Sequence, residues 1–533
     1  MPIDAPGTDA GPADAGRFDG GTLDAGPDLP RSCVSPDGAD TAGTNALDDA
    51  LGRASVTIED AQACLRTYQL FSTAARRDDL PASPRTVTER GSTLRSGHDL
   101  FDALYALALE EARESSVSSI RDGAFLNGTA VPCPAGGCYQ TGRLWTYVWT
   151  RDTAYSVDLG LAALDPARAR ASLEFKLSER RGGGGEQIVQ DTGSGGSYPV
   201  SSDRVVWALG AWTLLAHLEG AERIAFRDRA YGAITNTIEH DRAVVFDTGD
   251  GLYSGEQSFL DWREQSYPEW TADDVAHIAQ SKALSTNLLH LRAIEIASDI
   301  AQERGDVAAR DRYRGWADAL RARIRERFWI ESAGLYSTFA TTLLDPSPVR
   351  RWDLLGSALA ILTGVADTAQ AERILSSYPH YLRSAGPGAA PVMFPQSQLT
   401  AIYHNRAEWP FVSAYWLRAD HDGVADRMVQ ALVRGAALNL SNMENLEAAT
   451  GAPYVEDGIY SGPVVNSQRQ LWSVAGYVSM VHHSLFGLHE AASGLEIAPY
   501  VTRGLRNGMF AGTNELALND FPWHGRTITV VLH

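Results

Sequence analysis

The sequence predicts a mainly α-helical protein in which about six helical hairpins form a double ring, with inner helices around a centre and outer helices around those. The chain has 533 residues, of which 44% are hydrophobic and 21% charged, so it is long enough for one large domain with appendages. Along it, a helix rich in aromatic and small residues is repeatedly followed by a more charged one. The loops between these pairs are long and rich in Gly, Asp and Trp, which is typical of functional loops.

The two members of each helical pair differ in the pattern of their apolar residues. The first member is apolar nearly all round, which predicts burial on every side, and the second is amphipathic, which predicts an outer layer. The apolar segments are 152–164, 202–218, 281–302, 351–364, 409–420 and 467–487; the amphipathic segments are 165–180, 223–240, 310–329, 367–379 and 422–438, and a further helix at 98–116 precedes them. Asp165 and Pro166 form a favourable N-cap and first-turn pair for the first amphipathic helix.

Four regions follow one another along the chain. Residues 1–32 are dominated by Asp, Ala, Gly and Pro, so we expect a disordered linker. We expect residues 33–94 to be an N-terminal helical extension, with a helical segment at 46–70, and residues 95–490 to form the double ring. Residues 491–533 alternate apolar and polar side chains and predict a small β-strand appendage. Because the chain ends on a strand-like run, we expect a further strand to be missing or supplied from elsewhere.

The charge and the cysteines of the chain limit the classes of binding partner and indicate the cellular compartment. The formal net charge is −20, and such a surface repels phosphate backbones, which argues against nucleic acid as a partner. No apolar run approaches the roughly 18 to 20 residues that a membrane-spanning helix needs. Cys133 and Cys138 bracket a loop that a disulfide can close, Cys33 and Cys64 flank the start of the folded region, and the spacing resembles no zinc site. Two disulfides would suit a secreted, periplasmic or cell-surface bacterial protein whose linker followed a removed signal peptide or lipid anchor; four free thiols are the alternative.

Segments rich in carboxylates and aromatic rings lie just before the apolar helices, so we expect them to gather at one mouth of the ring. They are 149–152, 198–207, 261–270, 404–409 and 442–472. Glycoside hydrolysis needs one protonated carboxyl to assist the leaving oxygen and one ionised carboxylate to activate water or attack carbon. Arg151 and Asp152 stand side by side in the apolar run 145–160, so they are either a structural ion pair or the polar end of a sugar pocket; we favour the pocket. Asp203 and Arg204 repeat this arrangement one hairpin later.

Three stretches resemble known glycosidases. "YVWTRDTAY" resembles the "TWTRDS" segment of glucoamylases, glycoside hydrolase family 15, in which the Arg-Asp pair grips the hydroxyls of the terminal glucose. "NMENLEAATGAP" resembles the stretch in which that family's catalytic base precedes a Thr-Gly by six positions, a spacing that Glu444 has here. Residues 466–487 look like the final inner helix of six-hairpin glycosidases, including family 63 and debranching-type enzymes. Over residues 95–490 the resemblance implies an (α/α)6 toroid and an inverting, exo-acting glycosidase that releases a glucose-like, α-linked hexose from an oligo- or polysaccharide.

The resemblance also suggests roles for individual residues. For the general acid, glucoamylases place a Glu directly after a Trp and debranching-type enzymes an Asp two residues after one; here Trp262 is followed by Arg263 and then Glu264, with Asp261 as the competitor. For the general base Glu444 leads, with Glu447 and the Glu456-Asp457 pair as alternatives. The expected substrate-binding residues are Trp149, Arg151, Asp152, Tyr198, Asp203, Arg204, Trp262, Arg263, His404, Glu408, Trp409, Glu456 and Gln468.

Two other classes of function stay open. A polysaccharide lyase on a similar toroid could use Tyr267, His404 and Arg263, and a non-catalytic glycan-binding protein would use the carboxylates only as hydrogen-bond acceptors. We expect no cofactor and no metal ion. Residues 247–256 have the Asp and Gly content of a calcium loop without the spacing of an EF-hand, so we favour a tight turn there. The oligomeric state is left open.

Overall fold

The computed structural model describes the greater part of the chain and confirms that it is mainly helical. The described residues are 22–24, 45–76, 80–123, 126–179, 184–191, 197–259, 274–340, 348, 352–384, 407–419, 424–447, 451–453, 466–491 and 493–533. Among them, no helix combines the length and the apolar character needed to cross a bilayer.

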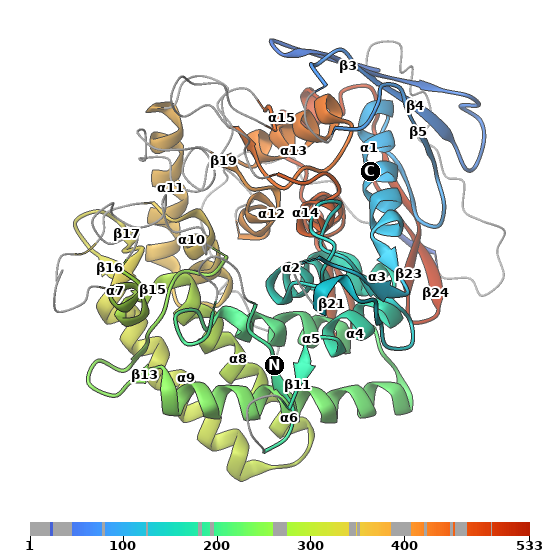
Figure 1. The fold of residues 1–533 in the computed structure, drawn as a ribbon. Coiled ribbons are helices and arrows are strands. Elements are labelled where there is room, and N and C mark those ends of the chain that lie inside the picture. The colour runs from blue at the N-terminus through green and yellow to red at the C-terminus, as the bar shows by residue number, and fades with distance from the viewer. Residues whose placement is uncertain are drawn as a thin grey trace.

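Within the described residues, six helices contact one another in a closed cycle, which we call the inner ring (Figure 1). In order they are α2 (Thr150–Ser156), α5 (Trp207–Leu215), α8 (Leu284–Glu303), α10 (Leu354–Leu362), α12 (Pro410–Ala419) and α14 (Leu471–Ser479), and α14 contacts α2. Every residue of α2 and of α14 is buried. This agrees with apolar side chains nearly all round each helix, since a helix without a polar face is stable only when neighbours cover all of it.

A second set of helices lies outside the inner ring. It comprises α1 (Asp99–Glu114), α4 (Pro166–Glu174), α6 (Gly220–Val244), α9 (Val307–Phe328), α11 (Thr368–Ser384) and α13 (Ala425–Asn439) (Figure 1). In α9 the buried residues recur every three or four positions and include Tyr313, Ala317 and Leu320, so one stripe packs inward on α8. The predicted cap is present, because Asp165 Oδ1 accepts the backbone N–H of Arg168 at 2.9 Å ahead of Pro166.

The remaining helices and strands are short. The helices are α3 (Ala162–Leu164), α7 (Val275–Gln280) and α15 (Arg503–Asn507). The two-stranded pairs are β7 (Ser116–Val117) with β10 (Cys138–Tyr139), β8 (Ser119–Ile120) with β9 (Val131–Pro132), β11 (Leu177–Ser178) with β12 (Gln187–Ile188), β13 (Phe246–Asp247) with β14 (Leu252–Tyr253), β15 (Lys282–Ala283) with β18 (Phe339–Ala340), β16 (Trp329–Ile330) with β17 (Leu335–Tyr336), and β19 (Ala407–Glu408) with β20 (Leu446–Glu447).

The helical extension predicted for residues 33–94 is wrong over residues 46–88, which form an antiparallel sheet. Its order is β2 (Ala46–Asp49), β3 (Gly52–Ile58), β4 (Thr67–Ser72) and β5 (Arg85–Thr88). In β3, Ala54 and Val56 are buried while Ser55 between them is not, which is the two-residue period of a strand covered on one face. The β-branched residues of "SVTI" and the turn before Gly52 favour this structure over a helix.

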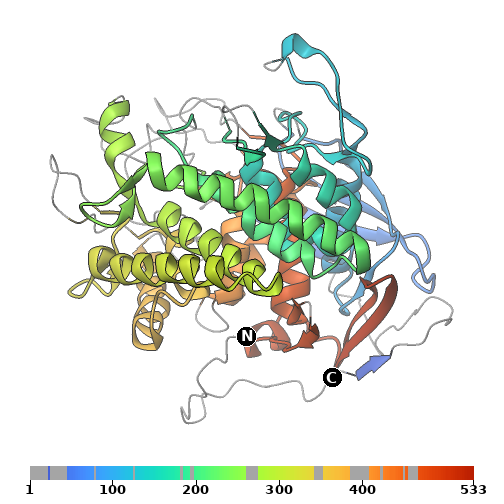
Figure 2. The same cartoon turned by 90° about the horizontal axis from the view of Figure 1, so that it is seen from below.

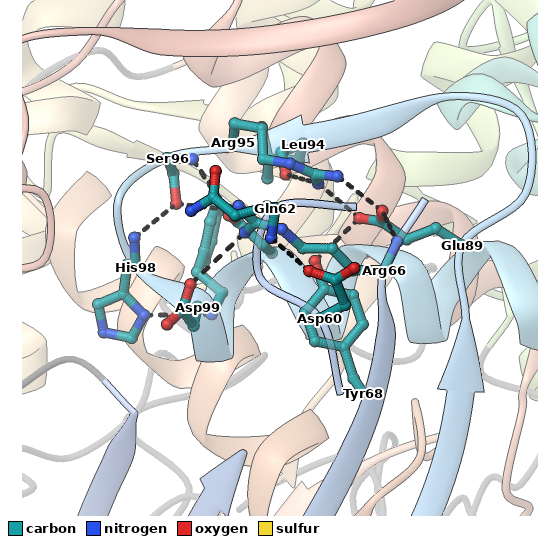
Figure 3. Close-up of polar contacts among 12 residues, drawn as sticks. Asp60, Gln62, Arg66, Tyr68, Glu89, Leu94, Arg95, Ser96, His98 and Asp99 are labelled. Atoms are coloured by element: carbon teal, nitrogen blue, oxygen red, sulfur yellow. Dashed lines mark hydrogen bonds and ion pairs between the residues drawn. The ribbon is translucent and has the colours of Figure 1, made fainter. Parts of the chain in front are cut away.

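Buried charges fasten this sheet to the start of α1 (Figure 3). Glu89 accepts hydrogen bonds from both terminal nitrogens of Arg95, at 2.6 and 2.8 Å, and from the hydroxyl of Tyr68 in β4 at 2.9 Å. The guanidinium of Arg66 lies 3.7 Å from Asp99 of α1. Because each charge has a partner of opposite sign, these side chains can be buried beside the helix.

The last residues form strands, as predicted. β21 (Leu488–Ala491) and β22 (Gly494–Ile497) form a hairpin, and β23 (Leu516–Trp523) and β24 (Arg526–Leu532) pair within a four-stranded sheet. The expected further strands come from earlier in the chain: β6 (Thr93–Arg95) pairs with β23, and β1 (Thr22–Asp24) pairs with β24 (Figure 2). β1 lies inside the region predicted to be a disordered linker, and at that point the prediction is wrong, because the free edge of β24 supplies a backbone hydrogen-bonding partner.

Candidate active site

The N-terminal ends of neighbouring inner-ring helices are tied together at one opening of the ring, here called the ring mouth. Gln470, the residue before α14, donates its side-chain Nε2 to Asp152 Oδ1 of α2 at 2.9 Å. Next to Asp152, the guanidinium of Arg151 lies 3.7 Å from Asp203, which begins the turn that leads into α5. These contacts join the starts of three helices, so the segments around 149–152, 198–207 and 466–472 meet as predicted.

The chain before α8 continues the ring mouth. The backbone N–H of Phe259 donates to Asp203 Oδ2 at 3.0 Å, and the N–H of Ser258 donates to Ser285 Oγ of α8 at 3.0 Å. Gln257 donates its Nε2 at 3.0 Å to Asp353, whose other oxygen caps α10. Residues 257–259 therefore link α5, α8 and α10.

Arg151 pairs with two carboxylates that come from other parts of the chain. Its guanidinium lies 3.8 Å from Asp191 and 3.7 Å from Asp203. Asp191 also accepts two backbone N–H groups at the start of α2, at 2.9 and 3.2 Å, and lies 3.3 Å from Lys176 Nζ. The charge of Arg151 is thus shared with Asp191 and Asp203 as well as with Asp152.

Asp152 and Glu444 are two buried carboxyls at the ring mouth, 4% and 3% exposed. Burial raises the pKa of Asp152 well above its usual range; the charges of Asp191 and Glu444 raise it further, and Arg151 opposes the rise. Glu444 Oε2 accepts the indole N–H of Trp145 at 2.8 Å, a bond that favours an ionised carboxylate. A buried carboxyl with a raised pKa thus lies at the ring mouth together with a second buried carboxyl, and such carboxyls are the groups that general acid–base chemistry uses.

Aromatic rings form a wall at the ring mouth. The rings of Trp409 and Trp472 lie 5.7 Å apart, and Phe411 stacks on Trp472 at 4.4 Å. Phe259 contacts all three, at 5.1 to 5.9 Å. Phe259 has a φ of 58°, a left-handed conformation that is costly for a bulky residue, so the surrounding contacts must hold it in place.

Glu408 and Glu447 lie on opposite faces of the β19–β20 pair. In its register Ala407 faces Glu447 and Glu408 faces Leu446. Leu446 is directed at Gly435 of α13, so Glu408 lies on the side of the outer helix, and Glu447 lies on the other side. Glu408 is 1% exposed, and burial raises its pKa to about 8, although Arg434 and Ser413 oppose the rise.

Tyr198 and Arg204 face the outer helix α6. Arg204 Nη2 donates to Asp241 of α6 at 2.5 Å, and its guanidinium lies 4.3 Å from the centre of the Tyr198 ring. Asp203, in contrast, faces the ring mouth through Arg151 and Phe259. The predicted repeat of the Arg151–Asp152 arrangement is therefore split: Asp203 joins the ring mouth, and Arg204 forms a buried ion pair.

Two further predicted substrate-binding residues lie beside these groups. Trp149 is half-buried next to the ring of Tyr147, at 5.6 Å, and Gln468 lines a surface groove two residues before Gln470. Several predicted residues lie outside the described part of the chain: Asp261, Trp262, Arg263, Glu264, Tyr267, His404, Glu456 and Asp457.

Trp145, Asp191, Phe259 and Gln470 belong to the ring mouth but are missing from the predicted set. Trp145 and Gln470 lie within the segments 145–160 and 442–472, so the clustering of aromatic and polar residues was a signal for both. Asp191 and Phe259 carry no such signal, because one acts as a cap on a helix distant in sequence and the other through its backbone conformation.

Residues 247–256 form the predicted tight turn. Asp247 Oδ1 accepts the N–H of Gly249 at 2.9 Å within the β13–β14 hairpin. Lys282 Nζ lies 3.0 Å from Asp247 and 3.3 Å from Asp250, so an ammonium group occupies the place a cation would take.

The three described cysteines are all oxidised. Cys133 and Cys138 form the disulfide that their spacing predicts. Cys64 is also disulfide-bonded, and Cys33 lies outside the described residues.

Comparison with known proteins identifies the fold class. By sequence the chain matches no family model and no curated protein. A family GH78 rhamnosidase of Bacillus sp. GL1 is similar in structure, with a TM-score of 0.50 at 15% identity over 80% of this chain and 41% of the rhamnosidase. A sialidase has a TM-score of 0.58 at 13% identity over 83% of this chain and 38% of its own. The chain thus has a fold found in glycoside hydrolases, and it spans about two fifths of the length of these two proteins.

Proposed function

We propose that this protein is a glycoside hydrolase of the (α/α)6 toroid class. The observation that carries the proposal is the pair of buried carboxyls, Asp152 and Glu444, held beside an aromatic wall where the inner-ring helices begin. Burial raises the pKa of Asp152, so a neutral Asp152 can hydrogen-bond sugar hydroxyls, and Glu444 is left as the carboxyl that can act as the base. The structural likeness to a rhamnosidase and a sialidase supports the same class of chemistry.

In the proposed mechanism Glu444 is the general base. Its hydrogen bond from Trp145 favours the ionised form that can deprotonate a water molecule. The general acid is Glu264 or Asp261, which follow Phe259 of the ring mouth by five and two residues. Arg151, Asp152 and Gln470 bind sugar hydroxyls, and Trp409 and Trp472 bind the apolar face of the ring.

We further propose exo-action with inversion on a glucose-like, α-linked hexose, as the resemblance to glucoamylases implies. Inversion requires the acid and base carboxyls to be about 6.5 to 9.5 Å apart, with water between the base and the anomeric carbon. The disulfide at Cys133 and Cys138 favours an oxidising compartment, in agreement with a secreted, periplasmic or cell-surface protein.

The test is a screen of α- and β-glycosides and oligosaccharides in which product anomers are followed by NMR. We expect Glu444→Gln to lower kcat by roughly 100-fold or more. Glu264→Gln and Asp261→Asn identify the acid, and Glu447→Gln tests the competing base. Glu326→Gln, a change on the exposed face of α9, is the matched control.

Three outcomes would contradict the proposal. Full activity of Glu444→Gln would overturn the assignment of the base. An unsaturated product from uronate polymers would indicate a lyase, and binding without turnover would indicate a glycan-binding protein.

A further inference from the structure

A surface groove lies between the N-terminal sheet and the loop that leads into α14. Its volume is about 590 Å³, and it is lined by Arg85 of β5, Glu114 at the end of α1, Arg143, and Gln468 with Arg469. Pro81 and Pro84 form its apolar side. The groove brings together four segments that are distant in sequence, so its shape depends on the whole fold.

Arginines are frequent among the described residues of this groove, on a strongly acidic protein. The described residues that line it include three arginines and one carboxylate, whereas the chain as a whole has a formal net charge of −20. Arg85 is paired with the carboxylates of Glu111 at 2.7 Å and Glu114 at 3.1 Å. Arg469 instead donates to the backbone carbonyl of Glu114, so this contact does not neutralise its charge.

Charges of both signs act on Arg469. Burial lowers the pKa of Arg469; the carboxylates of Glu114 and Glu111 oppose that fall, and the smaller effects of Arg143 and Arg85 add to it. An anion bound beside Arg469 would oppose the same fall, because an opposite charge nearby favours the charged guanidinium.

The backbone fixes the position of Arg469. This residue has a φ of 44°, in the left-handed region that non-glycine residues seldom adopt. Its N–H donates to Ser441 Oγ at 2.9 Å, and Ser441 in turn donates to Glu111 at 2.5 Å. A long side chain on such a restrained backbone is presented at a defined place, which favours a specific binding role over a solvated surface charge.

The groove lies beside the segment that leads to the ring mouth. The N–H of Arg143 donates to the carbonyl of Gln468 at 3.2 Å, and the next residue, Leu144, donates to Ser467 Oγ at 3.1 Å. The carbonyl of Ser467 accepts the N–H of Glu444 at 2.9 Å. The segment that lines the groove at Gln468 therefore also holds the backbone of Glu444 through Ser467, so the groove and the ring mouth are neighbours.

We propose that this groove binds an anionic sugar unit, bearing a carboxylate or a sulfate, of the same glycan whose neutral end enters the ring mouth. The inference rests on the proposed glycoside hydrolase function and specifies its substrate class as acidic glycans. The guanidinium groups of Arg143 and Arg469 would bind the acidic group through paired N–H donors, and the prolines would contact the sugar face.

Direct binding tests the proposal without requiring turnover. Tetragalacturonate and sulfated maltotetraose are titrated against the full chain by calorimetry at low and moderate salt, with carboxyl-reduced tetragalacturonate and maltotetraose as neutral counterparts. We expect each anionic probe that fits to bind at least about tenfold more tightly than its neutral counterpart, with a preference that falls as salt rises. The two anionic arms separate carboxylate from sulfate recognition.

Variants locate the binding. Arg143→Gln, at an exposed side chain, should weaken binding of the anionic probe about fivefold to tenfold and leave binding of the neutral probe unchanged. Arg469→Lys keeps the charge but loses the paired donors, and should weaken it less. Arg327→Gln, at an exposed arginine of the outer helix α9, is the control and should change neither.

The outcomes separate this inference from the proposed function. Equal binding of anionic and neutral probes, or an Arg143→Gln variant that binds the anionic probe as the wild type does, overturns the groove assignment even if neutral glycosides are hydrolysed. Selective, Arg143-dependent binding without hydrolysis of any glycoside supports the groove and overturns the glycosidase proposal.

Discussion

At the scale of single residues, the proposed chemistry depends on which protonation state each buried carboxyl is given by its neighbours. Glu444 receives an indole N–H, Asp152 receives an amide N–H, and Glu408 is faced by the hydroxyl of Ser413 and the charge of Arg434. Burial raises the pKa of both Asp152 and Glu408, and the groups that face each carboxyl add to that rise or oppose it.

Removing the indole donor should weaken the proposed base. In Trp145→Phe the aromatic ring stays and the hydrogen bond to Glu444 is lost, so we expect kcat/KM to fall by about tenfold or more. Steady-state kinetics on the best substrate of the glycoside screen measures this. The control is Trp329→Phe, because Trp329 donates the same kind of bond, at 2.6 Å, to Glu331 on the surface. Equal losses in both variants would contradict a specific role for Trp145.

Glu408 should make stability depend on pH. Its folded-state pKa of about 8 is above the ordinary value near 4.5, so the folded protein binds a proton that the unfolded chain has released. The contribution of Glu408 to the free energy of unfolding is then greatest below about pH 4.5 and falls as pH rises toward 8. Glu408→Gln should flatten this fall, so that its midpoint of thermal unfolding exceeds that of the wild type by more at pH 8 than at pH 5. A constant difference across that range would contradict the assignment.

The position of a site residue was predictable where the neighbouring sequence has a distinctive pattern. The partner of its side chain was not predictable, because the fold brings that partner from a distant segment. The aromatic run around Arg151 and Asp152 lies at the ring mouth, where Gln470 contacts Asp152. The partners of Arg151, Asp191 and Asp203, come from segments about 40 and 50 positions away, and no local pattern specifies which carboxylate an arginine reaches. The same local pattern at Asp203 and Arg204 led to different surroundings for the two residues.

At the scale of elements, the helices were predictable and the N-terminal strands were not. Helices such as α8 and α9 have 20 and 22 residues, so the contrast between all-round apolar and one-sided patterns has room to repeat. β3 and β4 have seven and six residues, too short for periodicity alone to separate a strand from a helix. Contact with α1 and α13 then decides in favour of the sheet.

The buried charges under this sheet should contribute strongly to its attachment. Glu89→Gln removes the charge opposite Arg95 and leaves that guanidinium buried, so we expect a loss of about 3 to 5 kcal/mol in unfolding free energy. Thermal and urea unfolding measure it. The double variant Glu89→Leu with Arg95→Met removes both charges and should recover much of the loss. A double variant as unstable as Glu89→Gln would show that the pair acts through something other than unbalanced charge.

At the scale of the whole molecule, the ring mouth exists only if the inner ring closes, and closure requires the first and last inner helices to pack. α14 contacts both α2 and the π-helical segment Val157–Leu161 that follows it. Gly160 in that segment has a φ of 129°, and a Cβ there would lie 2.9 Å from Val478 Cγ1 of α14. The same interface carries the Gln470–Asp152 hydrogen bond at the ring mouth. Packing between chain segments more than 300 residues apart therefore positions a proposed substrate-binding group.

Gly160→Ala should therefore lower both stability and activity. The added methyl group meets Val478, and alanine is strained at this backbone conformation, so we expect a loss of about 2 kcal/mol or more in unfolding free energy together with a lower kcat/KM. Adding Val478→Ala should relieve the clash but not the strain, and should recover only part of both losses. Gly232→Ala is the control, because Gly232 lies within α6 with no atom within 4 Å of an added Cβ, and there we expect unchanged or slightly higher stability. If Gly160→Ala were destabilised while kcat/KM on a small glycoside stayed at the wild-type value, the closure of the ring would not be what positions Asp152.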